Sequence, residues 1–238
     1  MKKILNINGL TVEYELIRRK RKTTELKLDP EKGLVITAPN TAPIKAVEEL
    51  ISQKSKWILD KIDYMEKKKE KRQVRKFETG EKFMFLGCEY ALEVIKTDFN
   101  AARLQLVEGR FLLEHPGCEA SLLKEIFAGW YKKCAQKILS ESVDKHSIYF
   151  DVAPKQVKAK EQKKIWGSCT HDNKLLFNWR LVMAPKWVID YVVVHEMCHM
   201  VHKNHSKDFW DLVEKIYPRF KDAKDWLKEN SLALDIVH

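Results

Sequence analysis

The stretch VHEMCHMVHKNHSKDFW, residues 194–210, holds four of the chain's eight histidines. His195 and His199 are four residues apart, so on a helix they lie on one face, about 6 Å apart along the axis. Two imidazoles at this spacing can bind one Zn²⁺ ion at ~2.1 Å each. Glu196 follows His195, beside the ligands, where a general base can take a proton from water at the metal. The H-E-x-x-H pattern therefore predicts a helical zinc site with a catalytic glutamate.

An alternative interpretation makes the preceding apolar run, DYVVV at 190–194, a buried strand and places the histidines on a solvated turn. Pro185 suits the first turn of a helix, and Ser206 suits the cap of the next one. The segment between them is also longer than the 4–8 residues of a typical strand. These signals favour a helix over about 185–203.

A catalytic zinc site also needs a third protein ligand and a position open to water. His202 shares the helical face of His195 and His199. It lies ~10 Å along the axis from His195, however, and three ligands in a line cannot surround one ion. We therefore predict that His202 is a surface residue or a support for a ligand.

The third ligand must come from chain that has turned back toward the helix. His205 qualifies if the helix ends near residue 203, Asn204 adopts a left-handed conformation and Ser206 caps the following helix. A carboxylate of that helix, Asp211 or Glu214, is the weaker alternative. The sequence thus predicts one catalytic Zn²⁺ bound by His195, His199 and His205.

Composition describes a globular chain of one large or two small domains, with 238 residues and a net charge of +10. No apolar run approaches a membrane span, and no signal peptide is recognised, so we expect no membrane association. The five cysteines are an odd number without C-x-x-C spacing. Reduced thiols and a cytoplasmic location are therefore expected.

The positive charge is concentrated in the N-terminal third. Residues 1–76 carry 20 Lys/Arg against 11 Asp/Glu, whereas residues 77–238 carry 24 against 23. Two basic runs, 18–22 and 67–76, are candidates for nucleic-acid contact. The alternative is a solvated hairpin and helix end. The basic runs contain no aromatic residues that could stack on bases, which weakens the case for single strands.

Periodicity predicts an α+β protein in two parts. Residues 1–116 read as a β-rich N-terminal region, with a hairpin near 24–39 and one long helix at about 43–71. Residues 117–238 read as the hydrolase domain that contains the H-E-x-x-H helix. Its expected elements are helices at 121–145, 185–203, 207–217 and 221–230 and strands at 156–162 and 174–183.

Several motifs together resemble a known family. They are WGSC at 166–169, FNWRLVMAP at 177–185, DYVVVHEMCH at 190–199 and NHSKDFW at 204–210. They look like those of the YgjP-like family of predicted metal-dependent hydrolases, relatives of the SprT-like and WLM zincins. The N-terminal RRKRKTTELKLD and ITAP segments share the resemblance, which covers nearly the whole chain.

The chain departs from these patterns at two positions. His202 stands where most zincins with H-E-x-x-H-x5-H carry glycine, and Ile165 stands where the family often has arginine before the tryptophan. The resemblance implies a zinc metallopeptidase acting on peptide or protein substrates. Hydrolysis of nucleotide pyrophosphates has also been proposed for the family.

The motifs outside the histidine helix have both functional and structural interpretations. The strand at 174–183 is a candidate edge strand for binding substrate backbone, and Asn178 and Arg180 are candidates for orienting a carbonyl or the metal ligands. The structural interpretation makes Trp166 and Trp179 core residues and Gly167 a close backbone contact. Cys169 and Cys198 are expected to be small buried residues. No oxyanion-stabilising residue is identified.

The predicted function is a zinc-dependent hydrolase, most simply a metallopeptidase in which Glu196 is the general base. One alternative is a metal-dependent nucleotide pyrophosphohydrolase, which the basic N-terminal third would suit although no glycine-rich phosphate loop is present. Another is a nucleic-acid-associated protein with a structural zinc site. The oligomeric state cannot be read from the sequence.

Overall fold

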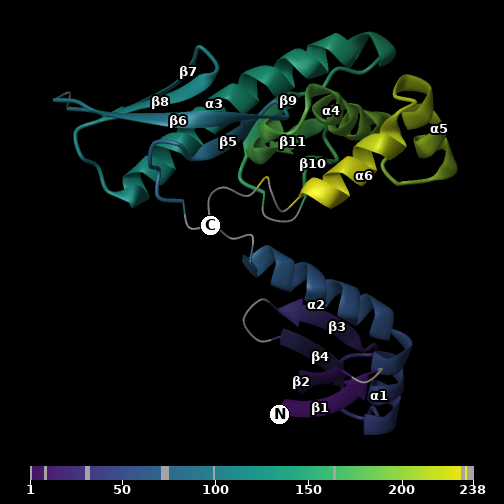
Figure 1. Ribbon diagram of the computed structural model, residues 1–238. Helices are drawn as coiled ribbons and strands as arrows, with labels where there is room; N and C mark the ends of the chain where they lie inside the picture. The colour runs from purple at the N-terminus through teal and green to yellow at the C-terminus, as the bar shows by residue number, and fades with distance from the viewer. Residues whose placement is uncertain are drawn as a thin grey trace. The chain divides into compact units, whose positions relative to one another are not determined.

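The computed structural model describes residues 2–7, 10–29, 33–70, 75–98, 100–162, 165–231 and 234. Helices and sheets are mixed, as the sequence predicted, and the chain divides into two compact units, residues 1–73 and 74–238 (Figure 1). No helix among the described residues is long and apolar enough to cross a membrane.

The first unit is a four-stranded sheet with two helices. The strand order is β1-β2-β4-β3, with β2 and β4 parallel and the outer pairs antiparallel. The elements are β1 (Lys2–Ile7), β2 (Leu10–Arg19), β3 (Glu25–Asp29), β4 (Gly33–Pro39), α1 (Ile44–Gln53) and α2 (Ser55–Glu70). The predicted hairpin is confirmed as β3–β4, which pairs Leu26 with Ile36 and Leu28 with Leu34.

The long helix expected at 43–71 is interrupted at Lys54. The Lys54 backbone leaves the helical conformation, with φ −99° and ψ 12°. Its N–H is shared between the carbonyls of Leu50 and Ile51, a three-centre bond common at helix ends. The change of direction keeps Ile51 on α1 and Ile58 on α2 in one core, where both are fully buried.

The second unit begins with another four-stranded sheet, of order β5-β6-β8-β7. Its strands are β5 (Lys82–Phe85), β6 (Cys88–Lys96), β7 (Arg103–Val107) and β8 (Arg110–His115), followed by the long helix α3 (Ala120–His146). The ring centroids of Phe83 and Phe127 are 4.5 Å apart, and the Tyr131 hydroxyl donates to the Met84 carbonyl at 2.7 Å. The sheet and α3 therefore share one core.

This packing moves the domain boundary away from the expected position at 116/117. The division falls after Gln73, because β5–β8 bury their aromatic side chains against the C-terminal half. Gly87, at φ +83°, approaches so closely that a Cβ atom there would lie 2.7 Å from Pro185 Cγ. The backbone N–H groups of Leu86 and Gly87 donate to the carbonyls of Val182 and Met183.

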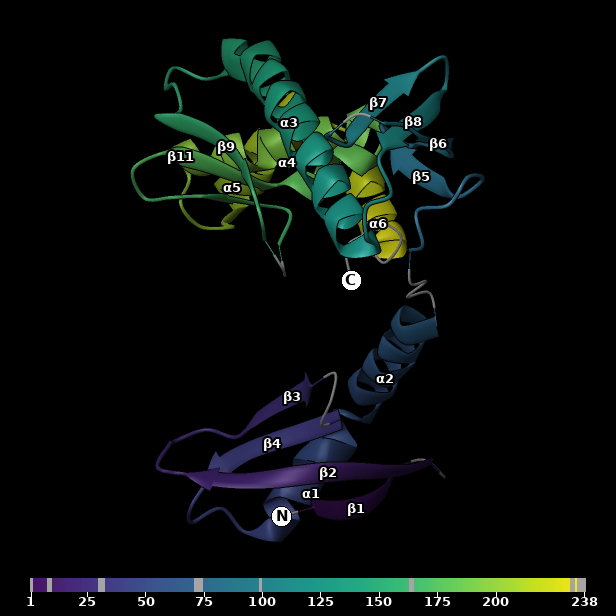
Figure 2. The ribbon, with the colours of Figure 1, turned by 90° about the vertical axis from the view of Figure 1, so that its left-hand side faces the viewer.

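The rest of the second unit is a three-stranded sheet with helices. The sheet has the order β10-β11-β9, and α3 contacts both β9 and β7 (Figure 2). The elements are β9 (Gln156–Lys160), β10 (Gly167–Cys169), β11 (Lys174–Asn178), α4 (Lys186–Val201), α5 (Lys207–Ile216) and α6 (Phe220–Asn230), with short 3-10 turns at Ser147–Tyr149 and Trp179–Met183. The four helices predicted after residue 120 are confirmed within two residues at each end.

The strand expected at 174–183 differs in length and position. It ends at Asn178, because the Asn178 side chain accepts from the Arg180 N–H and starts a 3-10 turn. β11 also lies in the middle of its sheet, paired with β10 on one side and β9 on the other. The edge-strand prediction for this segment is wrong, and the edge strands of this sheet are β10 and β9.

Candidate metal centre

Helix α4 carries His195, Glu196 and His199, and most of this helix is buried. Val193, Val194 and Met197 are fully buried beside them, and α4 contacts α3, α5, α6 and β10. The apolar run that precedes the histidines therefore holds this helix in the core.

The nitrogens of three histidines meet at one point. His205 Nε2 lies 3.2 Å from His195 Nε2 and 3.2 Å from His199 Nε2. The ligand atoms of these three residues all lie within 4.8 Å of one another. Two ligands at ~2.1 Å from one tetrahedral ion are about 3.4 Å apart. The observed separations thus fit a single zinc-sized ion.

The turn that brings His205 back differs from the expected one. Asn204 is not left-handed; among the described non-glycine residues, that conformation occurs at Phe77, Leu86, Glu108 and Asn173. The chain turns because His202 adopts an extended conformation after α4, with φ −119° and ψ 106°. Asn204 Oδ1 then accepts from the Ser206 N–H at 3.3 Å, and Ser206 Oγ caps α5 by accepting from the Phe209 N–H.

His202 takes part through its backbone. Its carbonyl oxygen lies 3.0 Å from His199 Nδ1. A proton on Nδ1 that is donated to this carbonyl leaves the Nε2 lone pair of His199 free for a metal. The His202 side chain does not join the metal-binding group found among the described residues, and neither do Asp211 and Glu214. Glu214 instead lies 3.8 Å from Lys221.

The environment favours the neutral form of the His195 and His199 imidazoles. Burial, with the nearby His199 and His205 and the charge of Lys224, lowers the pKa of His195 to about 3. Burial likewise lowers the pKa of His199. Neutral imidazole is the form that binds metal ions. His195 Nδ1 is buried without a hydrogen-bond partner among the described residues, while its Nε2 points toward His205.

Glu196 lies against the edge of β10. Its side chain is 6% exposed, and burial raises its pKa to about 8, against the opposing effect of a hydrogen bond from the Cys169 backbone. A Cβ atom on Gly167 would lie 2.7 Å from Glu196 Cγ and 2.8 Å from Oε1. Glycine is thus needed here for the strand to pass beside the carboxylate.

An open cleft of about 700 Å³ contains these groups. The histidines and Glu196 form its floor, and β10 forms one wall. Tyr191 and Leu227 add apolar surface, and three lysines, Lys203, Lys224 and Lys228, add positive charge. The cleft therefore contains the metal-binding group, an edge strand of the three-stranded sheet and several lysines.

Two aromatic residues that received no role from the sequence support the histidines. The Phe209 ring stacks on His199 with centroids 4.4 Å apart, and the Trp210 ring stacks on His205 at 5.7 Å. Both rings belong to the first turn of α5. The sequence signal for this supporting role was their position in NHSKDFW, four and five residues after His205.

Asn178 and Arg180 hold the chain beside the cleft and do not line it. The Asn178 amide donates to the carbonyls of Gln162 and Ile165. Arg180 forms a close ion pair with Glu161, which also accepts from Trp179 Nε1. The sequence interpretation that these side chains orient a carbonyl or the metal ligands is replaced by this supporting role.

Two arginines of the basic run at 18–22 make contacts within the first unit. Arg18 donates to the carbonyls of Pro39, Asn40 and Ala42 at 2.6 to 3.2 Å, and Arg21 pairs with Glu25 at 2.9 Å. In the run at 67–76, residues 71–74 lie outside the described residues.

Three converging histidines, an adjoining buried glutamate and an open cleft form the arrangement expected of a metal-dependent hydrolase. The profile of the YgjP-like family, metallopeptidase domain, matches residues 22–230. The chain belongs to this family, as its motifs predicted, and the family implies a catalytic metal, usually zinc.

Comparison with curated proteins finds no match. Among solved structures, the metallopeptidase zymogen abylysin of Pyrococcus abyssi is 17% identical, with a TM-score of 0.36. The alignment covers 39% of this chain and 93% of that one. A similarity of this size carries no conclusion about the fold.

Proposed function

We propose that the chain is a zinc-dependent metallopeptidase with a zincin-like catalytic half, in which His195, His199 and His205 bind one Zn²⁺. The observation that carries the proposal is the position of His205 Nε2, 3.2 Å from both other imidazole nitrogens. A pair of histidines four apart on a helix is common, but a third that meets them at zinc-ligand spacing is specific to a metal site. All three lie within residues 117–238.

Each side chain has a defined part in peptide hydrolysis. When bound, Zn²⁺ lowers the pKa of a water molecule at the site toward ~7 and polarises the substrate carbonyl. The Glu196 carboxylate accepts a proton from the attacking water and then delivers it to the departing amine. The burial of Glu196 between α4 and β10 excludes competing solvent from this carboxylate.

Among the described strands β10 pairs only with β11, and this edge position supports a peptide as the substrate. β10 pairs with β11 on one side, and its residues line the cleft beside Glu196. An extended peptide can add to such an edge through backbone hydrogen bonds, which brings a peptide carbonyl beside the metal site.

The test combines metal analysis with hydrolysis of a fluorogenic peptide library. Wild-type protein should contain one zinc per chain and cleave peptides, and a chelator should abolish cleavage until zinc is restored. Glu196→Gln should keep its zinc and lose at least about 100-fold in turnover. Full turnover by zinc-loaded Glu196→Gln would contradict the proposed base.

The nucleotide alternative is supported by the cleft lysines, since Lys203, Lys224 and Lys228 could face a phosphate group. It predicts metal-dependent release of pyrophosphate from nucleoside triphosphates, with no peptide cleavage. The nucleic-acid alternative predicts salt-sensitive DNA binding by a zinc-loaded protein without hydrolysis.

A further inference from the structure

The lining of the cleft includes two lysines of one helix. Lys224 and Lys228 are four residues apart on α6, so they lie on one helical face, and both line the cleft that holds the histidines. Like charges at this spacing disfavour a helix. The repulsion between the two charges therefore opposes the stability of α6, although Lys228, in the last turn, interacts favourably with the helix dipole.

Lys224 lies close to the metal-binding group. Its Nζ is 4.8 Å from the centre of the Trp210 ring, and this ring lies 5.7 Å from the rings of both His195 and His205. One indole thus separates the ammonium group from two of the proposed ligands. Lys224 is therefore a charged group close to the proposed metal site.

The third cleft lysine has a structural partner. Lys203 Nζ donates to Asn173 Oδ1 at 2.5 Å and to the Thr170 carbonyl at 3.3 Å. Lys224 and Lys228, in contrast, form no ion pair within the described residues. The acidic groups of the lining are Asp225, on the same helix, and the buried Glu196. The α6 wall therefore presents net positive charge to a ligand.

We propose that Lys224 and Lys228 bind the carboxylate of an acidic residue next to the scissile bond, so that the enzyme prefers Glu- or Asp-containing peptides. This inference rests on the proposed peptidase function. Apolar surface from Leu227 and Tyr191 in the same cleft suits the methylene groups and backbone of a peptide. The edge strand β10, whose residues line the same cleft, would hold that peptide in register.

Binding is measured separately from catalysis in zinc-loaded Glu196→Gln protein. The probes are fluorescein-labelled peptide pools in which Glu, Gln or Lys occupies one position and is scanned along the peptide. At one position, Glu should bind roughly five- to tenfold tighter than Gln, with Lys weakest, for two partly solvated charge contacts. Lys224→Gln/Lys228→Gln should bring the Glu-to-Gln ratio to about one, and Lys224→Glu/Lys228→Glu should favour Lys.

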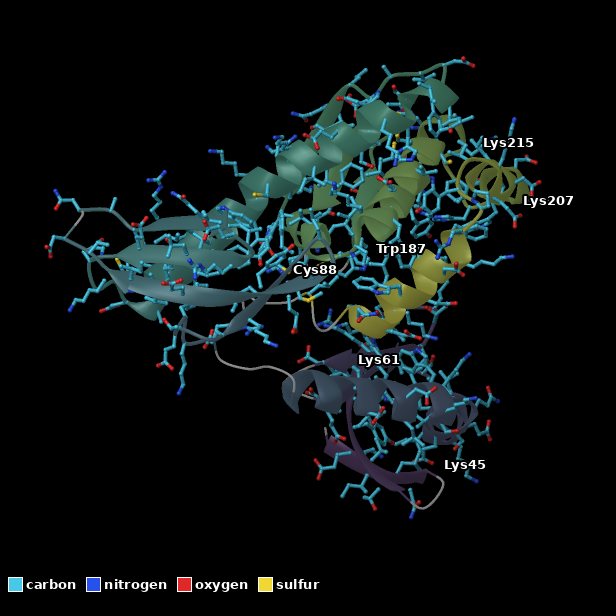
Figure 3. All side chains as sticks on the ribbon, turned by 45° about the horizontal axis from the view of Figure 1, so that its top comes forward. Lys45, Lys61, Cys88, Trp187, Lys207 and Lys215 are labelled. Atoms are coloured by element: carbon cyan, nitrogen blue, oxygen red, sulfur yellow. The ribbon has the colours of Figure 1, made fainter. Side chains whose placement is uncertain are left out.

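The matched control is Lys215→Gln/Lys221→Gln, which removes the same net charge. Lys215 is exposed on α5 (Figure 3) and Lys221 is exposed on α6, and neither lines the cleft. This control should keep the preference for Glu. The preference should also shrink between about 50 and 500 mM salt, because the Debye length falls below 10 Å.

The outcomes separate this inference from the proposed function. Equal binding of Glu and Gln pools at all positions, or an unchanged preference in Lys224→Gln/Lys228→Gln, would overturn the inference even if wild-type protein cleaves peptides. If the preference for Glu over Gln disappears when Lys224 and Lys228 are replaced, the inference is supported, even where turnover of peptides is slow. Cleavage of nucleotides by wild-type protein, with no binding of any peptide pool, would overturn both.

Discussion

Gly167 on β10 leaves room for the carboxylate of Glu196, since a Cβ atom at residue 167 would lie 2.7 Å from Glu196 Cγ. Neither the strand backbone nor the buried helix α4 can easily move away. The glycine of the WGSC motif thus positions the proposed general base, a role that neither motif alone indicates.

Gly167→Ala should displace the Glu196 side chain and lower kcat by roughly tenfold to 100-fold, because small misplacements of a catalytic group are costly. Zinc content should stay at the wild-type value, since the three histidines are not contacted. Gly129→Ala is the matched control. Gly129 lies within α3 with no atom near its would-be Cβ, so that alanine should raise the free energy of unfolding by up to about 1 kcal/mol without changing turnover. Wild-type turnover by Gly167→Ala would contradict this positioning role.

His205→Ala and His202→Ala should differ in metal content. Loss of His205 removes one of the three convergent nitrogens, so zinc measured by elemental analysis should fall well below one per chain after dialysis. His202→Ala should retain zinc, because His202 acts through its backbone carbonyl. Undiminished zinc in His205→Ala would refute this residue as a ligand.

Ser206→Ala should weaken both the fold and the metal site. Ser206 caps α5, and loss of such a cap lowers the free energy of unfolding by about 1 kcal/mol. His205 precedes the cap directly, so zinc affinity measured by competition with a chelator should also fall. Ser206→Asp preserves the capping oxygen and should restore both quantities. Failure of aspartate to rescue would show that the cap is not the cause.

Asp190 should stabilise the attachment of α4 to α3. Its carboxylate accepts from Ser142 Oγ at 2.6 Å and from Lys145 Nζ at 2.7 Å. Asp190→Ala leaves the buried Ser142 hydroxyl without this partner and should lower the free energy of unfolding by about 1–3 kcal/mol in urea titrations. Lys145→Gln removes only the exposed end of the contact and should cost less than about 1 kcal/mol. Equal losses in the two variants would contradict this ranking.

The local features of the histidine helix were predictable from sequence. The spacing of His195 and His199, the buried run before them and the cap at Ser206 depend on residues within one or two helical turns. Helical periodicity and capping chemistry act over that range. The position of His205 beside the pair was also predicted. The turn that brings it there differs from the expected one, because an extended His202 and a hydrogen bond to the Asn204 side chain take the place of a left-handed Asn204.

Features that depend on distant segments were missed. The central position of β11 in its sheet was missed because its pairing with β9 joins residues 18 positions apart, as in Lys174 with Gln156. The boundary at 116/117 failed because the aromatic core of β5–β8 is completed by α3, which begins after it.

By itself, the sequence determined which side chains are the candidates for binding a metal and acting as a base, because helical spacing is a local property of the backbone. Only the tertiary structure decided which residues from other elements lie around these side chains. Gly167 lies against Glu196, and Lys224 and Lys228 share a cleft with the histidines, because burial of a common core brings β10 and α6 to the same cleft. The residue pattern within β10 or α6 does not predict that these elements lie near one another, because their proximity results from the packing of the whole second unit.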